Sequence, residues 1–220
     1  MGHNSAEYLH HLIEAKKVAF ADLARHVADA AHMEIDPKAL IDPSYLETRQ
    51  ALIDPNRAAV RVEPGKFATA TETIYLSVAD SDGNMVSFIH SIFGSFGSGV
   101  VVPGTGFVLQ NRGAGFTLED GHPNQVAPGK RPFHTLIPGF VTKSGQPLMA
   151  FGVMGGSMQP QGHVQVVLNM IEFGMDPQEA IDAARFRHRG ALRVSVENMT
   201  PALQEGLEAL GHEIAPWQTT

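Results

Sequence analysis

The spacing of hydrophobic residues changes from a helical period to a strand-like period near Thr73. Residues 4–29 place apolar side chains at helical spacing, which predicts an amphipathic helix beginning with a capping box at Asn4 and Glu7. The apolar positions are Leu9, Ile13, Phe20, Leu23 and Val27, whereas Lys16, Lys17 and Asp22 fall elsewhere around the helix. A short helix is also expected over 44–51, between Asp-Pro turn signals.

From Thr73 onward, alternating segments predict strands. Residues 73–80 and 85–92 are joined by Ser-Asp-Gly-Asn, and an Asp-Gly pair between two such runs is a strong hairpin signal. Residues 104–110 and 134–142 are further candidate strands, and a turn over 143–146 leads into another at 147–154.

The last third of the chain has helical signals. A helix is expected over 164–173, closed by Gly174, and Asp176-Pro177-Gln178-Glu179 has the features of a second helix start. A third helix is expected from Thr200 to Gly211. Strands followed by helices, without strict alternation, indicate a layered α+β architecture.

Composition narrows the functional classes. The 220 residues suffice for one domain with a sizeable core, and the net charge of -7 argues against nucleic-acid binding. The absence of cysteine excludes a thiolate metal site and a cysteine nucleophile. The chain shows neither an apolar run of about 18 residues nor a signal peptide at its start, so it predicts no membrane partner and its compartment stays unknown.

Most familiar catalytic patterns are missing. The eleven histidines have no metal-ligand spacing, and the adjacent His10 and His11 lie about 100° apart on a helix. The glycine-rich loop over 94–99 lacks a P-loop ending, and no Gly-x-Ser-x-Gly elbow occurs. The sequence implies no metal and no organic cofactor.

Thr73, at the head of a predicted strand, has two interpretations. A threonine there is most often structural. The alternative is an amino-terminal nucleophile, freed by cleavage of the preceding peptide bond. A free α-amine has a pKa of about 7.7 to 8.0 and can accept the proton of the neighbouring hydroxyl.

Several ordered motifs favour the second interpretation, because the chain from Thr73 resembles the small subunit of the γ-glutamyltransferase (glutathione hydrolase) family of N-terminal nucleophile hydrolases. The departures at the headgroup positions, given below, resemble the γ-glutamyltransferase-like, cephalosporin-acylase-related branch. The matching segments are Leu76–Asn84, Phe96–Gly106, Ala127–Pro132, Gly155–Ser157 and Arg185–His188.

The resemblance implies roles for individual residues. Thr73 matches the threonine that cleaves the precursor and attacks the substrate, and Ser91 matches a hydroxyl residue that tunes it. Gly155 and Gly156 match the pair whose N–H groups form the oxyanion hole.

The positions that hold the γ-glutamyl headgroup in the family differ here. They contain Phe93, Arg112, Gly115, His134 and Thr135 in place of an Asn, a Gln or Glu, an Asp and two serines. The side chains at these positions no longer include an acidic residue, so they should bind a glutamyl group poorly. Arg112, in contrast, can pair with a carboxylate.

By this resemblance, residues 1–72 form the end of a large subunit and residues 73–220 the catalytic segment of a four-layer αββα sandwich, here incomplete. Most of the large subunit is expected as a further partner segment. The substrate is a small γ-glutamyl compound or another acyl amide. Three hypotheses follow: a γ-glutamyl hydrolase or transferase, a glutaryl- or cephalosporin-type acylase with an altered headgroup pocket, and an inactive fragment with a structural role only.

Overall fold

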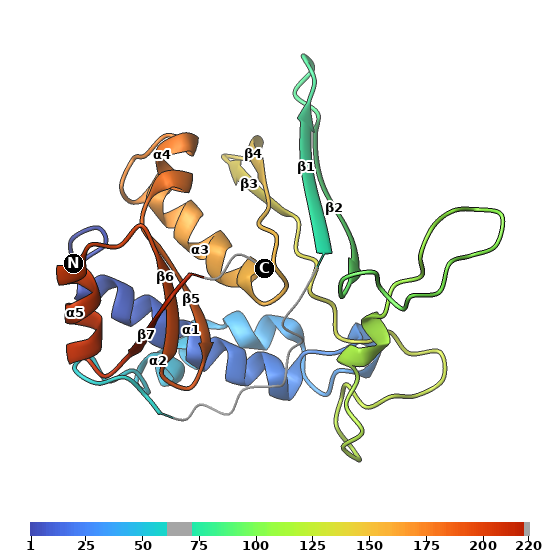
Figure 1. The fold of residues 1–220 in the computed structure, drawn as a ribbon, viewed down its shortest axis with the longest axis horizontal. Coiled ribbons are helices and arrows are strands. Elements are labelled where there is room, and N and C mark those ends of the chain that lie inside the picture. The colour runs from blue at the N-terminus through green and yellow to red at the C-terminus, as the bar shows by residue number, and fades with distance from the viewer. Residues whose placement is uncertain (61–71, 218–220) are drawn as a thin grey trace. The chain divides into compact units, whose positions relative to one another are not determined.

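The computed structural model describes residues 1–60 and 72–217. Part of the predicted large-subunit end, residues 61–71, lies outside this range. The chain forms two compact units. The terminal unit comprises Met1–Lys66, Glu119–Gln125 and Gln165–Thr220, and the central unit comprises Phe67–Leu118 and Val126–Val164. Both contain helix and strand, which gives the α+β class that was predicted (Figure 1).

The terminal unit begins with helix α1 (Ala6–His26). Its N-cap is Ser5, whose hydroxyl accepts the Tyr8 N–H at 3.1 Å, so the capping box predicted at Asn4 is wrong. Asn4 instead has a φ of 50° and lies outside the helix. Leu9, Ile13 and Phe20 are buried as predicted.

Short helices follow α1, and each begins at an aspartate cap. They are η1 (Ala30–His32), η2 (Pro37–Ile41) and α2 (Pro43–Gln50). The Asp42 side chain accepts the Ser44 N–H, and Pro43 occupies the first turn of α2, where its missing N–H costs no hydrogen bond. No helix among the described residues is long and apolar enough to cross a membrane.

The end of the chain adds α4 (Pro177–Asp182) and α5 (Pro201–Ala209), both where the sequence predicts them. Asp176 and Glu179 form the expected capping box. A sheet of three strands that was not predicted follows: β5 (Arg185–Gly190), β6 (Arg193–Glu197) and β7 (Glu213–Pro216). Strand β6 pairs with β5 in antiparallel and with β7 in parallel orientation.

The core of the terminal unit lies between this sheet and helices α1 and α5. Its residues are Leu9, Ile13, Phe186, Val194, Val196, Met199 and Leu207. Figure 1 shows α1 passing along the sheet and α5 beside β7. A side chain such as Phe186, which is 2% exposed, contributes about 1.5–3 kcal/mol through its burial.

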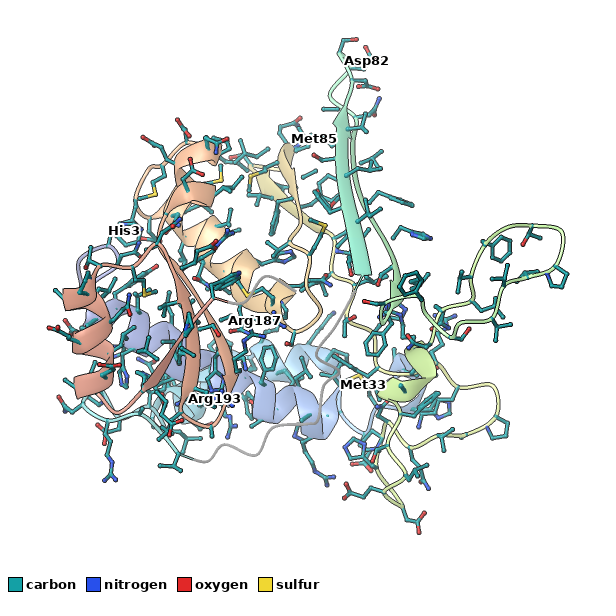
Figure 2. The ribbon with its side chains drawn as sticks, viewed as in Figure 1. His3, Met33, Asp82, Met85, Arg187 and Arg193 are labelled. Atoms are coloured by element: carbon teal, nitrogen blue, oxygen red, sulfur yellow. The ribbon has the colours of Figure 1, made fainter. Side chains whose placement is uncertain are left out.

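The central unit is built on the hairpin of β1 (Glu72–Ala79) and β2 (Met85–Phe93). The strands pair in register from Thr73 opposite Ser91 to Ala79 opposite Met85, with an irregularity at Glu72 and Thr73. Figure 2 shows Asp82 at the tip of this hairpin and Met85 at the start of β2. Gly83 supplies the positive φ, 84°, that the predicted turn requires.

A second hairpin, β3 (Gly139–Lys143) and β4 (Gln146–Phe151), lies against the first. Its turn residues Ser144 and Gly145 have φ values of 52° and 78°, as in the tight turns that suit twisted strands. The Ser87 hydroxyl donates to the Phe151 carbonyl at 3.2 Å, and the ring of Tyr75 fills the space beside Gly152. The chain beyond β4 is thereby fixed to β1.

Two predicted strands are wrong in extent. Over 104–110 there is only an isolated bridge between Val101 and Val108, because Gly104 and Gly106 adopt positive φ and turn the chain back. The strand predicted at 134–142 is limited to β3. Helix α3 (Met158–Ile171) also begins before the predicted position of 164.

Candidate active site

Thr73 lies near the start of β1 with its hydroxyl directed across the hairpin. Its Oγ1 donates a hydrogen bond to Ser91 Oγ at 3.2 Å, and the two residues are opposite each other in the strand register. The side chain is half-buried. A threonine hydroxyl that donates a hydrogen bond gains electron density on its oxygen, which favours nucleophilic attack once a base accepts the proton.

Ser91 connects Thr73 to the end of β2. Its Oγ also accepts the Phe93 N–H at 3.0 Å. The next residue, Gly94, donates its N–H to Asn111 Oδ1 at 2.8 Å, and the Asn111 N–H donates to the Ile92 carbonyl at 3.2 Å. These bonds hold the end of β2 against the 3₁₀ helix η3 (Arg112–Gly115).

Arg112 lies beside Phe93 in the interior of the central unit. Its guanidinium carbon is 5.1 Å from the Phe93 ring centroid, and its Nη1 donates to Thr135 Oγ1 at 2.8 Å. Arg112 is 3% exposed, and Nη2 has no hydrogen-bond partner among the described residues. Burial lowers the pKa of Arg112 from its ordinary value, but a guanidinium keeps its charge in proteins.

The surroundings of the neighbouring His134 disfavour its protonated form. Partial burial, followed by the charges of Arg112 and Arg131, lowers its pKa. The ring is exposed overall. A neutral imidazole beside Arg112 can donate or accept a hydrogen bond without adding charge to the site.

Gly155 and Gly156 form a turn between β4 and α3. Their φ values are 109° and 56°, and their carbonyls accept the N–H groups of Met158 and Gln159, both at 3.0 Å. A Cβ at Gly155 would lie 3.2 Å from the Met158 Cβ. Within the described chain, no backbone carbonyl accepts a hydrogen bond from either glycine N–H.

The structure thus brings most of the predicted site into one compact unit. Hydrogen bonds and ring contacts connect Thr73, Ser91, Phe93, Arg112 and Thr135. His134 joins this group only through the charge of Arg112, which contributes to lowering the His134 pKa after burial. The ring of Tyr75 lies against Gly152, so β1 contacts the segment that leads from β4 to the turn at Gly155 within the same unit.

Sequence reasoning missed residues that support this site. Asn111 fixes the end of β2, and Gln159, which is fully buried, accepts the Ile137 N–H at 3.3 Å. His163 Nε2 accepts the Val153 N–H at 3.1 Å, and burial lowers its pKa. The signal that could have identified Gln159 is its position: it is a polar residue at the start of α3, close after the glycine pair.

A buried polar cluster in the terminal unit was also unexpected. Ligand-type atoms of His10, Glu14 and His212 lie within 4.8 Å of one another. The Lys17 ammonium lies 2.7 Å from Glu14 and donates to the Ala59 carbonyl, so it supplies the positive charge inside this cluster. No ligand spacing is visible along the chain, because His212 is remote in sequence from α1.

The γ-glutamyltranspeptidase family model matches residues 1–220. The chain belongs to this family. It is 40% identical over 184 residues to the glutathione hydrolase-like YwrD proenzyme of Bacillus subtilis, covering 84% of this chain and 34% of that protein. It is 37% identical over 217 residues to the oxamate amidohydrolase proenzyme of Klebsiella pneumoniae, covering 96% and 40%.

Similarity to solved structures supports the assignment to this family. Cephalosporin acylase from Bacillus halodurans superposes with a TM-score of 0.89 at 45% identity, over 98% of this chain and 39% of that chain. γ-Glutamyltranspeptidase from Pseudomonas nitroreducens gives a TM-score of 0.60 at 29% identity, over 64% and 81%. This chain therefore spans well under half of the length of the proenzymes and acylase it matches, and corresponds to their C-terminal part.

Proposed function

We propose that the protein is an N-terminal threonine amide hydrolase that cuts itself before Thr73 and then hydrolyses, or transfers the acyl group of, small amides of the γ-glutamyl or related acyl type. The hydrogen bond from Thr73 Oγ1 to Ser91 Oγ, 3.2 Å long at the head of β1, carries this proposal. Family membership and the proenzyme names of the relatives support it.

Self-cleavage begins with attack of Thr73 Oγ1 on the carbonyl carbon of Glu72. The C–N bond between these residues breaks as a C–O ester bond forms, and the hydroxyl proton passes to the nitrogen, which becomes an α-amine. Water then hydrolyses the ester, leaving a carboxylate on Glu72 and restoring the Thr73 hydroxyl. The products are two chains, and Thr73 is the first residue of the second.

Turnover uses the same oxygen. The freed amine, with a pKa of about 7.7 to 8.0, accepts the Thr73 hydroxyl proton as Oγ1 attacks the substrate carbonyl. The N–H groups of Gly155 and Gly156 stabilise the oxyanion, to which a single donor contributes about 2.7–4 kcal/mol in other enzymes. The proton passes to the leaving amine, and water or an acceptor amine then takes the acyl group from threonine.

The same proposal assigns the missing layers of the fold to a partner segment. We expect the complete protein to form a four-layer αββα sandwich in which a large-subunit segment covers the hairpins. One face of the β1–β2 hairpin supports this, because its side chains are apolar and exposed: Ile74, Leu76, Val78, Val86 and Phe88. A two-stranded hairpin with a bare apolar face is marginally stable alone in water.

The first test is the mass of the purified full-length protein during incubation at neutral pH. Wild-type protein should separate into two chains at Glu72–Thr73, and Thr73→Ala should stay intact and inactive. Thr142→Ala, which removes an exposed threonine on β3 of the same unit, is the matched control and should process normally. An intact wild-type chain would support the inactive-fragment hypothesis and overturn the proposed function.

A further inference from the structure

We infer that the side-chain amine of Lys16 is a site of reversible carbamylation by carbon dioxide. The Nζ lone pair attacks the carbon of CO2, a C–N bond forms, one C=O π bond becomes an oxyanion, and one proton leaves Nζ for water. The product is a carbamate that carries a negative charge in place of the ammonium. Lys16 and its neighbours lie in the terminal unit, whereas Thr73 lies in the central unit, so the inference does not depend on the proposed function.

Lys16 lies on α1 with its amine held between an aromatic ring and an imidazole. The side chain is half-buried, and Nζ lies 2.8 Å from His188 Nδ1 and 3.8 Å from the centroid of the Phe20 ring. His188 Nε2 donates to the Ala191 carbonyl at 2.8 Å, so the neutral ring presents Nδ1 as an acceptor. No carboxylate pairs with Lys16 in the parts of the chain that the structure describes. The amine is thus positioned without a counterion.

The charges nearest to Lys16 disfavour its ammonium form. Lys17 is the next residue on α1, and Arg187 is the residue before His188 on β5 (Figure 2). Glu14, the acidic residue nearest in sequence, is paired with Lys17 at 2.7 Å. Burial, followed by the charges of Lys17 and Arg187, lowers the pKa of Lys16 to about 7. Above that pH most of the amine is unprotonated, and the unprotonated amine is the form that attacks CO2.

Arg187 lacks an acceptor for its buried guanidinium. The side chain is 9% exposed, and Nε has no hydrogen-bond partner among the described residues. Arg187 adjoins His188, the residue that contacts Lys16, and its charge acts on the amine. A buried charge without a counterion is costly. Carbamylation of Lys16 replaces the repulsion between two cations with attraction between an anion and a guanidinium, which keeps its charge in proteins.

Three other lysines differ from Lys16 in burial or in pairing. Lys17 is 4% exposed, and its ammonium is paired with Glu14 at 2.7 Å. Lys38 and Lys143 are exposed to solvent. A half-buried amine without a counterion, close to a guanidinium that lacks an acceptor, therefore distinguishes Lys16 from these three lysines. They serve as internal controls for a reaction that any unprotonated amine can undergo.

Chemical trapping of the carbamate tests the inference on the full-length protein. The protein is equilibrated with carbon-13-labelled bicarbonate and CO2 at about pH 8, alkylated with triethyloxonium ion, digested and analysed by mass spectrometry. We expect the labelled ethyl carbamate at Lys16 at an occupancy at least about 10-fold above that at Lys38 and Lys143. Equal labelling of these three lysines, or no label on Lys16, would overturn the inference.

Variants at Arg187 test the group that pairs with the carbamate. Arg187→Met should lower the occupancy at Lys16 by about 10-fold, because it removes both the pairing cation and a charge that keeps the amine unprotonated. Arg187→Lys retains the charge and should keep part of the occupancy. Arg193→Met removes an exposed arginine on β6 (Figure 2) and, as the charge-matched control, should leave the occupancy within about twofold. Unchanged occupancy in Arg187→Met would overturn the role assigned to Arg187.

Protein stability provides a readout that needs no trapping chemistry. Urea unfolding at about pH 8 is measured with bicarbonate and CO2, and separately with sodium chloride at the same ionic strength. A ligand that reacts with the folded state stabilises it, so CO2 should raise the urea midpoint of the wild-type protein but not that of Lys16→Arg, which keeps the charge and cannot form this carbamate. Equal stabilisation of both proteins would identify bicarbonate as an adventitious ion only and would overturn the inference.

Discussion

At the residue scale, the Ser91 hydroxyl connects Thr73, the proposed nucleophile, to the end of β2. It accepts hydrogen bonds from Thr73 Oγ1 at 3.2 Å and from the Phe93 N–H at 3.0 Å. Removing this oxygen leaves a partly buried backbone donor unpaired and frees the Thr73 hydroxyl to rotate. Ser91 therefore positions Thr73 and also supports the strained backbone at Phe93.

We expect Ser91→Ala to slow both self-cleavage and turnover by about 10- to 100-fold, since losing a partner for a buried polar group costs about 1–3 kcal/mol. The loss in turnover should appear chiefly in kcat, because the Ser91 hydroxyl contacts the oxygen that we propose as nucleophile. Ser91→Thr retains the hydroxyl and should recover most of the rate. Mass spectrometry over time measures the rate of self-cleavage. If Ser91→Ala cleaves itself at the wild-type rate, the hydrogen bond between Thr73 and Ser91 is not needed for cleavage.

The resemblance and the hairpin register predicted that Thr73 and Ser91 lie opposite each other, but not the contacts around Arg112. Thr73 and Ser91 follow from the resemblance, and their opposition follows from the register of a hairpin whose Asp-Gly turn is visible in the sequence. The unpaired Nη2 of Arg112 and the positive φ of Phe93 depend on contacts between segments far apart in the chain. Such contacts leave no local pattern, so the sequence identified the residues without their geometry.

At the element scale, helices and hairpins with strong end signals were predicted well. Helix α5 has its N-cap at Thr200, and β3 and β4 meet at Ser144-Gly145, as expected. The sheet of β5, β6 and β7 was missed because β5 carries three arginines and because β7 pairs in parallel with a strand before α5. Parallel pairing depends on a crossover and not on a turn motif.

Helix α1 shows how far a buried face can depart from an apolar stripe. His10, Glu14 and Lys17 are at most 4% exposed, although Lys17 was expected away from the core. The Lys16 ammonium contacts His188 Nδ1 at 2.8 Å, and His188 Nε2 donates to the Ala191 carbonyl. His10 contacts His212 and the Asp54 carbonyl, and Lys17 pairs with Glu14 and donates to the Ala59 carbonyl. Helical periodicity cannot predict the contacts with residues outside α1.

These contacts predict a pH-dependent stability. Burial and the charge of Lys16 lower the pKa of His188 to about 3, and burial and the charge of Lys17 lower that of His212 to about 3. Both rings bind a proton near pH 6.5 when unfolded, so the unfolded state binds more protons between pH 6.5 and 3. Their stabilising contribution is complete above pH 6.5 and falls as the pH decreases, by up to about 1.4 kcal/mol per pH unit for each ring.

Lys16 acts in a different pH window. Burial and the charges of Lys17 and Arg187 lower the pKa of Lys16 to about 7, so the unfolded chain binds more protons between about pH 7 and its ordinary pKa of 10.5. Stability should rise with pH in that interval. The slope of unfolding free energy against pH between pH 4.5 and 6.5 therefore reports proton binding by the histidines, without a contribution from Lys16.

The measurement is urea unfolding of the full-length protein at several values between pH 4.5 and 6.5. His188→Gln should reduce the slope of unfolding free energy against pH, whereas His11→Gln, at an exposed hydrogen bond to the Glu7 carbonyl, should not. Comparing slopes separates this effect from any constant loss of stability in the variant. An unchanged slope in His188→Gln would contradict the assignment of a buried neutral ring.

At the scale of the whole molecule, exposed apolar surface occurs in both compact units. The outer face of β1–β2 exposes Ile74 to 66% and Phe88 to 49%. In the terminal unit, α1 and α2 enclose a cavity of about 470 Å³ lined by aliphatic side chains and the ion pair of Asp22 and Arg49. Surfaces of this kind mark interaction sites. The added length of the relatives makes a large-subunit segment the expected occupant.

We therefore expect co-expression of this chain with the unmatched part of the Bacillus halodurans acylase to yield a complex that purifies together, because the two acylase parts share one structure and the matched part is 45% identical to this chain. Leu76→Asp on the apolar face should weaken the complex, since a charge would be buried without a partner. Asp82→Asn, at the hairpin tip, is the control and should leave it intact (Figure 2). The proposed binding of a large-subunit segment would be contradicted if this chain sediments as a folded monomer or self-dimer and does not bind the acylase segment. Its apolar faces would then not require a large-subunit segment to bury them.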